Sequence, residues 1–169
     1  MEQLVVQAKK GNSEAFYELM ILNKEKLYRI ALSYLRNEQE ALEALQEVTY
    51  RAFKQIKKLK QPSYFSTWLI RILINYCIDE QKKKGKVITF AEVEQPSYQD
   101  NHALTLDVQI QITKLRSEYQ HVLILRYFQD LTIPEIARVL EKPEGTIKTW
   151  IHQAINELKG QWKEGDLRA

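Results

Sequence analysis

Cysteine, glycine and proline are scarce in this sequence, and long apolar runs are missing. Of the 169 residues, one is cysteine, five are glycine and four are proline. A single cysteine, Cys77, excludes an internal disulfide, and a small buried hydrophobe on a helix is its most common role. No segment is apolar for long enough to form a signal peptide or a membrane span. We therefore expect a cytoplasmic protein without stable membrane insertion.

The scarcity of helix breakers, together with many Leu, Ile, Lys and Glu, favours an all-α fold. Helical periodicity runs almost without interruption to about residue 85. It is lost over residues 87–104, where Pro, Ser, Asp and Asn concentrate, and it returns near Thr105. These changes predict two small helical domains, residues 1–86 and 105–169, joined by a flexible linker, residues 87–104. The second domain is expected to hold four helices.

Four capping patterns mark the expected starts of helices, because a short polar side chain there can accept from a backbone N–H. They are Asn12 or Ser13, Asn37 with Glu40, Ser117 with Gln120, and Thr132 with Glu135. The helix that begins after Asn37 is expected to run to Leu59, because apolar residues continue at helical spacing that far.

Residues 131–159, LTIPEIARVLEKPEGTIKTWIHQAINELK, contain two amphipathic segments separated by a stop at Lys142 and Pro143. The first segment has an apolar face of Ile133, Ile136, Ala137 and Leu140, and the second has one of Ile147, Ile151, Ala154 and Leu158. The opposite face of the second segment is polar and carries Lys148, Thr149, His152, Gln153 and Asn156. A helix of about three turns, braced by a preceding helix, fits the DNA major groove. An ordinary helical hairpin with a solvated face would show the same pattern.

A basic segment with interleaved aromatics precedes the linker. Between Arg51 and Lys86 there are ten Lys and Arg residues but only Asp79 and Glu80 as acids, whereas the charged residues from Val87 to Ile112 are all acidic. Unstacked bases need flat apolar partners and their phosphates need positive charge, so this segment suits a single DNA strand. The short polar residues Ser63, Ser66, Thr67 and Asn75 could hydrogen-bond an extruded base. Phe65 and Tyr76 fit a buried stripe better, which leaves Tyr64 as the stacking candidate.

Both halves resemble conserved regions of bacterial RNA polymerase sigma factors. Residues 37–53, NEQEALEALQEVTYRAF, and residues 65–84, FSTWLIRILINYCIDEQKKK, are similar to regions 2.2 to 2.4. Residues 115–159 are similar to region 4. With only a short linker between these segments, nearly the whole chain resembles the extracytoplasmic-function (ECF) type, which has domains 2 and 4 alone.

The resemblance implies roles for three groups of residues. Contacts with the clamp of core RNA polymerase are implied for Glu43, Gln46, Glu47 and Arg51. Capture of the melted minus-ten strand is implied for Lys58, Lys60, Tyr64, Ser66, Thr67, Trp68, Arg71 and Asn75. Reading of the minus-thirty-five duplex is implied for Thr132, Thr146, Lys148, Thr149, His152 and Gln153. The polymerase flap and an anti-sigma factor are further implied partners.

This sequence departs from the family pattern at positions that bear on both interfaces. Thr49 stands where an aromatic is usual, and Leu42 stands where an acid is common. Trp150 and Gln153 stand where arginines are frequent. The usual bidentate guanine contacts of those arginines are lost, which leaves Lys148 as the main cation of that helix. The promoter sequence of relatives therefore cannot be transferred, and Trp150 is expected to pack against its own domain.

Two other classes of protein remain open. An autonomous helix-turn-helix regulator would bind operator DNA without polymerase, but such proteins commonly dimerise and no obvious dimerisation heptad is present. In a helical enzyme, Glu43 and Glu47 could bind a metal, but the histidines are scattered and there is no phosphate-binding glycine loop. We therefore expect no catalytic residue, metal or cofactor.

Overall fold

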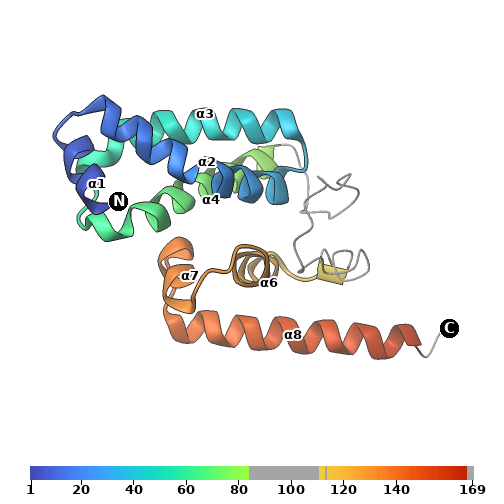
Figure 1. Ribbon diagram of the computed structural model, residues 1–169. Coiled ribbons are helices and arrows are strands. Elements are labelled where there is room, and N and C mark those ends of the chain that lie inside the picture. The colour runs from blue at the N-terminus through green and yellow to red at the C-terminus, as the bar shows by residue number, and fades with distance from the viewer. Residues whose placement is uncertain (84–110, 113, 167–169) are drawn as a thin grey trace. The chain divides into compact units, whose positions relative to one another are not determined.

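The structure is a computed structural model, and it describes residues 1–83, 111, 112 and 114–166. Every regular element of these residues is a helix, so the all-α fold is confirmed (Figure 1). The chain divides into two compact units, the first consisting mainly of Met1–Gly85 and the second mainly of the residues that follow. The linker predicted at residues 87–104 and the helix expected near Thr105 lie outside the described residues.

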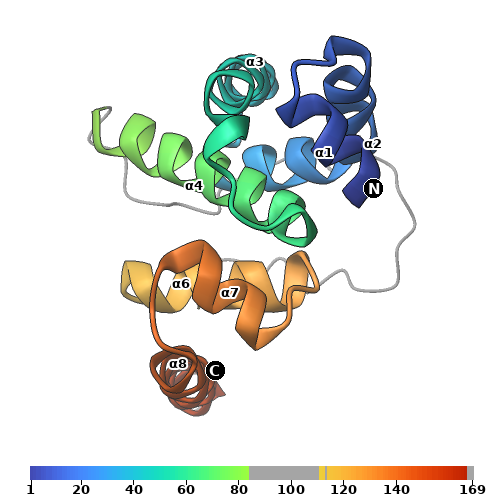
Figure 2. The ribbon, with the colours of Figure 1, turned by 90° about the vertical axis from the view of Figure 1, so that its left-hand side faces the viewer.

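The first unit is a bundle of α1 (Glu2–Lys9), α2 (Ser13–Leu35), α3 (Glu38–Gln55) and α4 (Phe65–Lys83). Helix α2 packs against the other three helices, and α3 also packs against α4 (Figure 2). The core of this unit consists of large side chains with almost no exposed surface, among them Leu19, Leu27, Ile30, Tyr34, Phe65, Leu69, Leu73 and Ile74. Cys77 is also fully buried on α4, which confirms the role expected for it.

Two of the predicted caps begin helices of this unit. The Asn12 side chain accepts from the backbone N–H of Ala15 at 3.0 Å. The Asn37 side chain accepts from the backbone N–H of Glu40 at 2.9 Å. Between these two starts, Arg36 adopts a left-handed conformation with φ of 52° and ends α2. The boundaries of α2 and the start of α3 therefore follow from local sequence.

The prediction that the third helix runs to Leu59 is wrong, because α3 ends at Gln55. A 3₁₀ turn, η1 (Ile56–Lys58), follows it, and a second one, η2 (Pro62–Tyr64), precedes α4. Ile56 and Leu59 are nevertheless buried. Residues three apart share one face of a 3₁₀ turn, so the apolar stripe continues while the backbone tightens.

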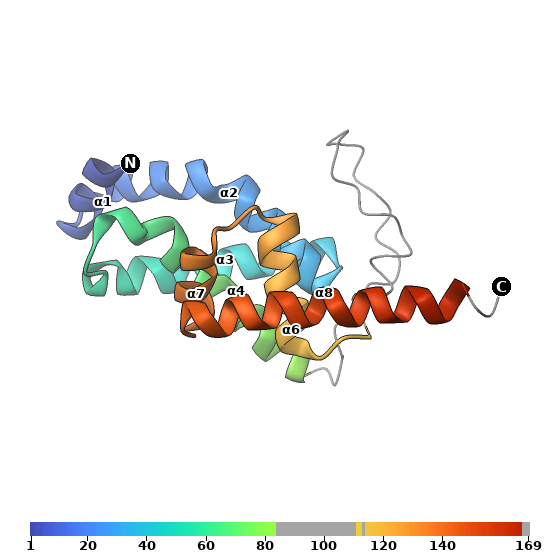
Figure 3. The ribbon, with the colours of Figure 1, turned by 90° about the horizontal axis from the view of Figure 1, so that it is seen from below.

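The second unit contains α6 (Ser117–Leu123), a π-helical turn η3 (Ile124–Phe128), α7 (Ile133–Leu140) and α8 (Glu144–Asp166). Helix α6 packs against α8 (Figure 3). The predicted length of the last helix is wrong, because α8 has 23 residues instead of about three turns. It continues through Gly160, since a lone glycine inside a helix costs only about 1 kcal/mol.

One capping prediction in this unit is confirmed and another is wrong. Thr132 and Glu135 form a reciprocal capping box at the start of α7. Ser117, however, is the first residue of α6 and not its cap, and the Arg116 side chain makes no capping bond. The side chain of the buried Gln120 instead donates to the carbonyl oxygen of Leu115 at 2.6 Å. A buried amide must find such a partner, and this need takes precedence over the capping pattern.

Candidate polymerase and nucleic-acid interfaces

Helix α8 has one buried face and one exposed face, as the sequence predicts. Ile147, Ala154 and Leu158 are buried, and Ile151 is half-buried. The residues predicted to read duplex DNA, Lys148, Thr149, His152 and Gln153, are all exposed, whereas Thr146 is half-exposed. Trp150 is half-buried. The capping box of α7 and the packed face of α8 therefore hold four short or flexible polar side chains toward solvent.

Hydrogen bonds limit what some of these side chains can offer to a ligand. The Thr149 hydroxyl donates to the carbonyl oxygen of Gly145 at 2.9 Å, so its oxygen is left as an acceptor. The Asn156 amide lies 3.2 Å from Nδ1 of His152. The Thr132 hydroxyl donates to a carboxylate oxygen of Glu135 at 2.7 Å and is thus engaged in the capping box. Lys148 forms no ion pair with any residue that the structure describes.

The residues predicted to capture the minus-ten strand differ in accessibility. Tyr64 is exposed in η2, and Lys58, Lys60 and Asn75 are exposed as well, while Trp68 and Arg71 are half-buried. Trp68 lies against Phe65 with ring centroids 5.9 Å apart, and Phe65 is a core residue as predicted. Thr67 is only 8% exposed. Its side chain faces the core, so in this conformation it is not presented to a DNA strand.

A buried asparagine supports the start of α4. The Ser66 hydroxyl donates to Oδ1 of Asn23 at 3.0 Å, and the Asn23 amide donates to the carbonyl oxygen of Leu19 at 2.8 Å. Sequence reasoning missed Asn23, although a signal was present. It occupies a core position between Leu19 and Leu27, four residues from each, and a polar residue inside an apolar stripe indicates a satisfied hydrogen bond.

Helix α1 is attached to the same loop. It packs against η1 and η2. The Lys9 ammonium group donates to the carbonyl oxygen of Leu59 at 2.5 Å, and the Ser66 hydroxyl lies 3.6 Å from the sulfur of Met1. The loop that carries Tyr64 is therefore held from two sides, by α1 and by Asn23 of α2.

The four residues implied to contact the clamp lie on two different sides of α3. Glu47 and Arg51 form an ion pair at 2.6 Å, and the Arg51 guanidinium lies 5.3 Å from the centroid of the Tyr76 ring on α4. Tyr76, predicted to be core, is only half-buried. Gln46 instead faces α2 and borders a groove. Glu43 is exposed one turn before Glu47.

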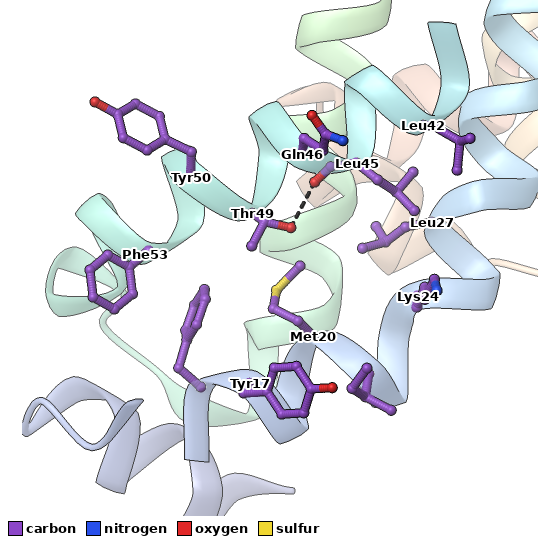
Figure 4. A pocket seen from close by; sticks show the side chains of 12 residues that line it. Tyr17, Met20, Lys24, Leu27, Leu42, Leu45, Gln46, Thr49, Tyr50 and Phe53 are labelled. Atoms are coloured by element: carbon purple, nitrogen blue, oxygen red, sulfur yellow. Dashed lines mark hydrogen bonds between the residues drawn. The ribbon is translucent and has the colours of Figure 1, made fainter. Parts of the chain in front are cut away.

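That groove lies between α2 and α3 and has a volume of about 810 Å³ (Figure 4). Its lining is mainly apolar and consists of Phe16, Tyr17, Met20, Ile21, Lys24, Leu27, Leu42, Leu45, Gln46, Thr49, Tyr50 and Phe53. Three of its aromatic side chains are more than half exposed, Tyr17 at 68%, Phe53 at 58% and Tyr50 at 54%. Exposed apolar grooves with a polar rim are common sites of contact with a partner protein.

The groove was not predicted, but its lining includes both departures from the family pattern in this helix, Leu42 and Thr49. The Thr49 hydroxyl donates to the carbonyl oxygen of Leu45 at 2.7 Å, so it turns its methyl group and not a free hydroxyl to the groove. Phe53 packs edge-on against Phe16, with ring centroids 5.3 Å apart. The lining is therefore ordered by contacts between the two helices.

Cys77 is not a chemical candidate. Burial, followed by the nearby Glu80 carboxylate, raises the pKa of its thiol to about 12. The thiolate is the reactive form of cysteine, so this thiol is inert at neutral pH.

Comparison with known proteins places both units in one family. A family model for sigma-70 region 2 matches residues 19–87, and one for sigma-70 region 4 matches residues 107–158. The chain is 31% identical over 182 residues to the ECF RNA polymerase sigma factor SigW of Bacillus subtilis (strain 168), with 97% of each protein covered. The chain belongs to the ECF family of RNA polymerase sigma factors. The resemblance stated from sequence is thereby confirmed.

Other relatives agree with this assignment. The RNA polymerase sigma factor SigV of Bacillus subtilis (strain 168) is 29% identical, with 86% of this chain and 89% of SigV covered. The solved structure of CnrH in complex with the cytosolic domain of CnrY has a TM-score of 0.71 at 20% identity and covers 96% of this chain and 97% of its own. The sigma factor RpoE in complex with the anti-sigma factor NepR from Bartonella quintana has a TM-score of 0.69 at 19% identity, with 88% and 96% covered. These two structures share the fold.

Family membership decides between the functional classes that the sequence leaves open. The protein is an alternative sigma factor, which directs RNA polymerase to promoters and has no catalytic activity of its own. The autonomous regulator is not favoured. No helix within the described ranges is both long and apolar enough to cross a bilayer.

Proposed function

We propose that the two units of this ECF sigma factor divide the work of promoter recognition. Residues 1–86 bind the polymerase clamp and capture the opened minus-ten strand, residues 87–104 connect the two units, and residues 105–169 read the minus-thirty-five duplex and contact the polymerase flap. Binding free energy, and no nucleophile, drives strand opening in this scheme, because each flipped base exchanges stacking in the duplex for contacts with the protein.

The observation that carries the polymerase assignment is the apolar groove between α2 and α3. A long partner helix can lay one apolar face into a groove of this kind, and exposed aromatics are the residues that most often dominate the binding energy. Gln46, one of the residues implied to contact the clamp, borders the groove. We assign the groove to the clamp coiled coil of polymerase, with Glu43, Glu47 and Arg51 forming the charged flank of that contact.

The minus-ten strand is assigned to the loop and helix that follow η1. Tyr64 is exposed for stacking, and Trp68, Arg71 and Asn75 follow it at accessible positions of α4. Lys58 and Lys60 supply exposed positive charge for phosphates. The Ser66 hydroxyl donates to Asn23, which leaves its oxygen as an acceptor for a base. We leave Thr67 out of this group because it is buried.

The minus-thirty-five duplex is assigned to the exposed face of α8, with Lys148, Thr149, His152 and Gln153 toward base edges and Thr146 toward the backbone near the start of the helix. The chain would act in the cytoplasm, where core polymerase is found. An anti-sigma factor that covers these surfaces until a signal releases it is a further proposed partner. The sigma factor RpoE of Bartonella quintana, which shares the fold, was solved in complex with one.

The direct test mixes the purified chain with bacterial core polymerase. Stable co-elution, and transcripts that depend both on the chain and on a selected promoter, are expected. Duplex binding by the chain alone, with no association with core, would favour an autonomous regulator instead. A permanganate footprint of the selected promoter then tests strand opening, since unpaired thymines should become reactive only when core and the chain are both present.

A further inference from the structure

The exposed side chain of Gln153 is tied to a buried residue of another helix. The hydroxyl of Tyr119 on α6 donates to Oε1 of Gln153 on α8 at 2.5 Å. Tyr119 itself is buried, and the guanidinium of Arg116 lies 4.7 Å from the centroid of its ring. Packing therefore fixes the hydroxyl in place, and the hydroxyl in turn fixes one end of the Gln153 amide.

This contact changes what Gln153 can recognise. A free glutamine amide pairs with adenine in two bonds, accepting from N6 with its oxygen and donating to N7 with its nitrogen. In this structure the oxygen is turned toward α6 and accepts from Tyr119, so the amide nitrogen, with its two hydrogens, is the end that remains for DNA. Guanine presents two acceptors, O6 and N7, in the major groove, whereas adenine presents one acceptor and one donor.

We propose that Tyr119 is a positioning residue that holds Gln153 as a hydrogen-bond donor and thereby makes it prefer guanine to adenine in the recognised duplex. The inference rests on the proposed role of α8 in duplex recognition. It also accounts for the loss of arginine at this position, because an amide whose oxygen is turned toward α6 offers DNA its two N–H donors, as arginine offers N–H donors, from a shorter, uncharged side chain. Lys148, another exposed residue of the same face, is also a pure donor.

The test selects bound sequences from a randomised duplex library, using the full-length chain with and without core polymerase. The Gln153→Ala variant identifies the base pair read by Gln153, as the position whose preference it abolishes. At that position the wild-type chain is expected to prefer guanine over adenine by about tenfold. The Tyr119→Phe variant removes only the hydroxyl and frees Oε1, so this preference should fall to near equality or turn toward adenine.

Two further variants separate positioning from a general loss of structure. Gln153→Glu keeps the shape of the side chain but replaces the donor by an acceptor, so the preferred base should change from guanine to cytosine, whose N4 donates. Tyr127→Phe removes the hydroxyl of a tyrosine that is exposed on the same unit, and it should leave every preference unchanged. Thermal unfolding of all variants is measured in parallel, because a merely structural role of Tyr119 would lower stability without changing the preferred base.

Several outcomes would overturn the inference. They are an unchanged guanine preference in Tyr119→Phe, a wild-type preference for adenine, and the absence of any base position that depends on Gln153, whether or not core polymerase is present. A guanine preference that depends on Tyr119 but is seen only without polymerase supports the role of Tyr119 and counts against the proposed function. The two failures are therefore distinguishable.

Discussion

The side of α3 that faces α2 and the exposed face of α8 are opposite in chemistry, although both helices bury another face in a small helical unit. Toward α2, α3 exposes Leu42, Tyr50 and Phe53, which line an apolar groove. Helix α8 exposes Lys148, Thr149, His152 and Gln153, which are polar and carry donors or acceptors at their tips. An apolar face gains free energy by leaving water for another protein, whereas a polar face gains little unless its hydrogen bonds find matched partners, such as base edges.

The family assignment alone therefore does not locate the interfaces on the surface. The resemblance implies that Glu43, Gln46, Glu47 and Arg51 act together, but only Gln46 lies at the groove. Glu47 and Arg51 neutralise each other in an ion pair whose side chains are a little over one third exposed. Such a pair contributes little to affinity by itself. The groove is the stronger candidate for the binding energy, and the charged flank is better suited to orientation.

The largest effect is expected from substitutions on the polar face of α8. The double variant Lys148→Ala with Gln153→Ala should lower promoter-dependent transcription by about 100-fold, because each lost base contact costs about 1–3 kcal/mol. Affinity for core polymerase should stay within a factor of two. Transcription from a selected promoter and a competition assay for core binding measure the two properties. Lys159→Ala, which removes an exposed lysine farther along α8, is the matched control. Loss of core binding in the double variant would contradict this division between faces.

The next largest effect is expected from a substitution in the apolar groove between α2 and α3. Phe53→Ala should lower affinity for core polymerase by about tenfold or more, since exposed aromatics in a groove commonly carry over 1 kcal/mol of binding energy. Loss of the edge-on contact with Phe16 should lower the thermal midpoint only slightly, because the Phe53 side chain is already 58% exposed. Duplex selection by the free chain should be unaffected.

Val6→Ala is the control for the groove, as Val6 is an exposed apolar residue of α1 that does not line it. The swapped pair Glu47→Arg with Arg51→Glu tests the charged flank, and it should weaken core binding less than Phe53→Ala does. A greater loss in the swapped pair would move the main contact from the groove to the flank.

A smaller effect is expected from the capping box of α7. Thr132→Ala should lower the free energy of unfolding of the second unit by about 1 kcal/mol, because it removes the acceptor for the Glu135 N–H. Chemical denaturation followed by circular dichroism measures this change. Thr132→Ser keeps the hydroxyl and should therefore retain most of the free energy of unfolding that Thr132→Ala loses. Equal destabilisation by Ala and Ser would show that the hydroxyl does not matter and that the methyl group does.

The last effect is confined to alkaline pH and concerns the core of the first unit. Burial, followed by Glu80, raises the pKa of Cys77 from 9.0 to about 12, so the folded state holds this proton more tightly than the unfolded state does. Stability from this source is complete below pH 9.0 and is lost as pH rises toward 12. Denaturation at a series of alkaline pH values should show a shallower decline for Cys77→Ala than for the wild-type chain. Parallel slopes would assign the alkaline loss to other groups.

Much of the fold follows from local pattern. The caps at Asn12, Asn37 and Thr132 are confirmed because a cap depends on a few consecutive residues. The buried and exposed faces of α8 are confirmed because periodicity reports which side of a single helix is apolar. The predicted end of α3 at Leu59 and the predicted cap of α6 at Ser117 were wrong. The burial of Ile56 and Leu59 replaced the expected pattern in the first place, and the pairing of Gln120 with Leu115, five residues earlier, replaced it in the second.

The contacts that define the interfaces were less predictable. Thr67 was expected to reach a DNA strand but is buried, and Ser66 is paired with Asn23, which lies 43 residues earlier in the chain. The groove is formed by side chains from two helices, neither of which looks unusual on its own. Sequence periodicity contains no information on which exposed residues of separate helices meet, because that depends on helix packing.

The helical character of this chain, the apolar faces of its helices and its family resemblance all follow from residue types at short spacing. Three other features depend on how the helices pack. Tyr119 bonds Gln153, Asn23 supports the start of α4 beside the loop of Tyr64, and α2 and α3 leave an apolar groove between them. Each of these features joins residues that are distant in the chain, and packing alone sets which groups come within contact distance.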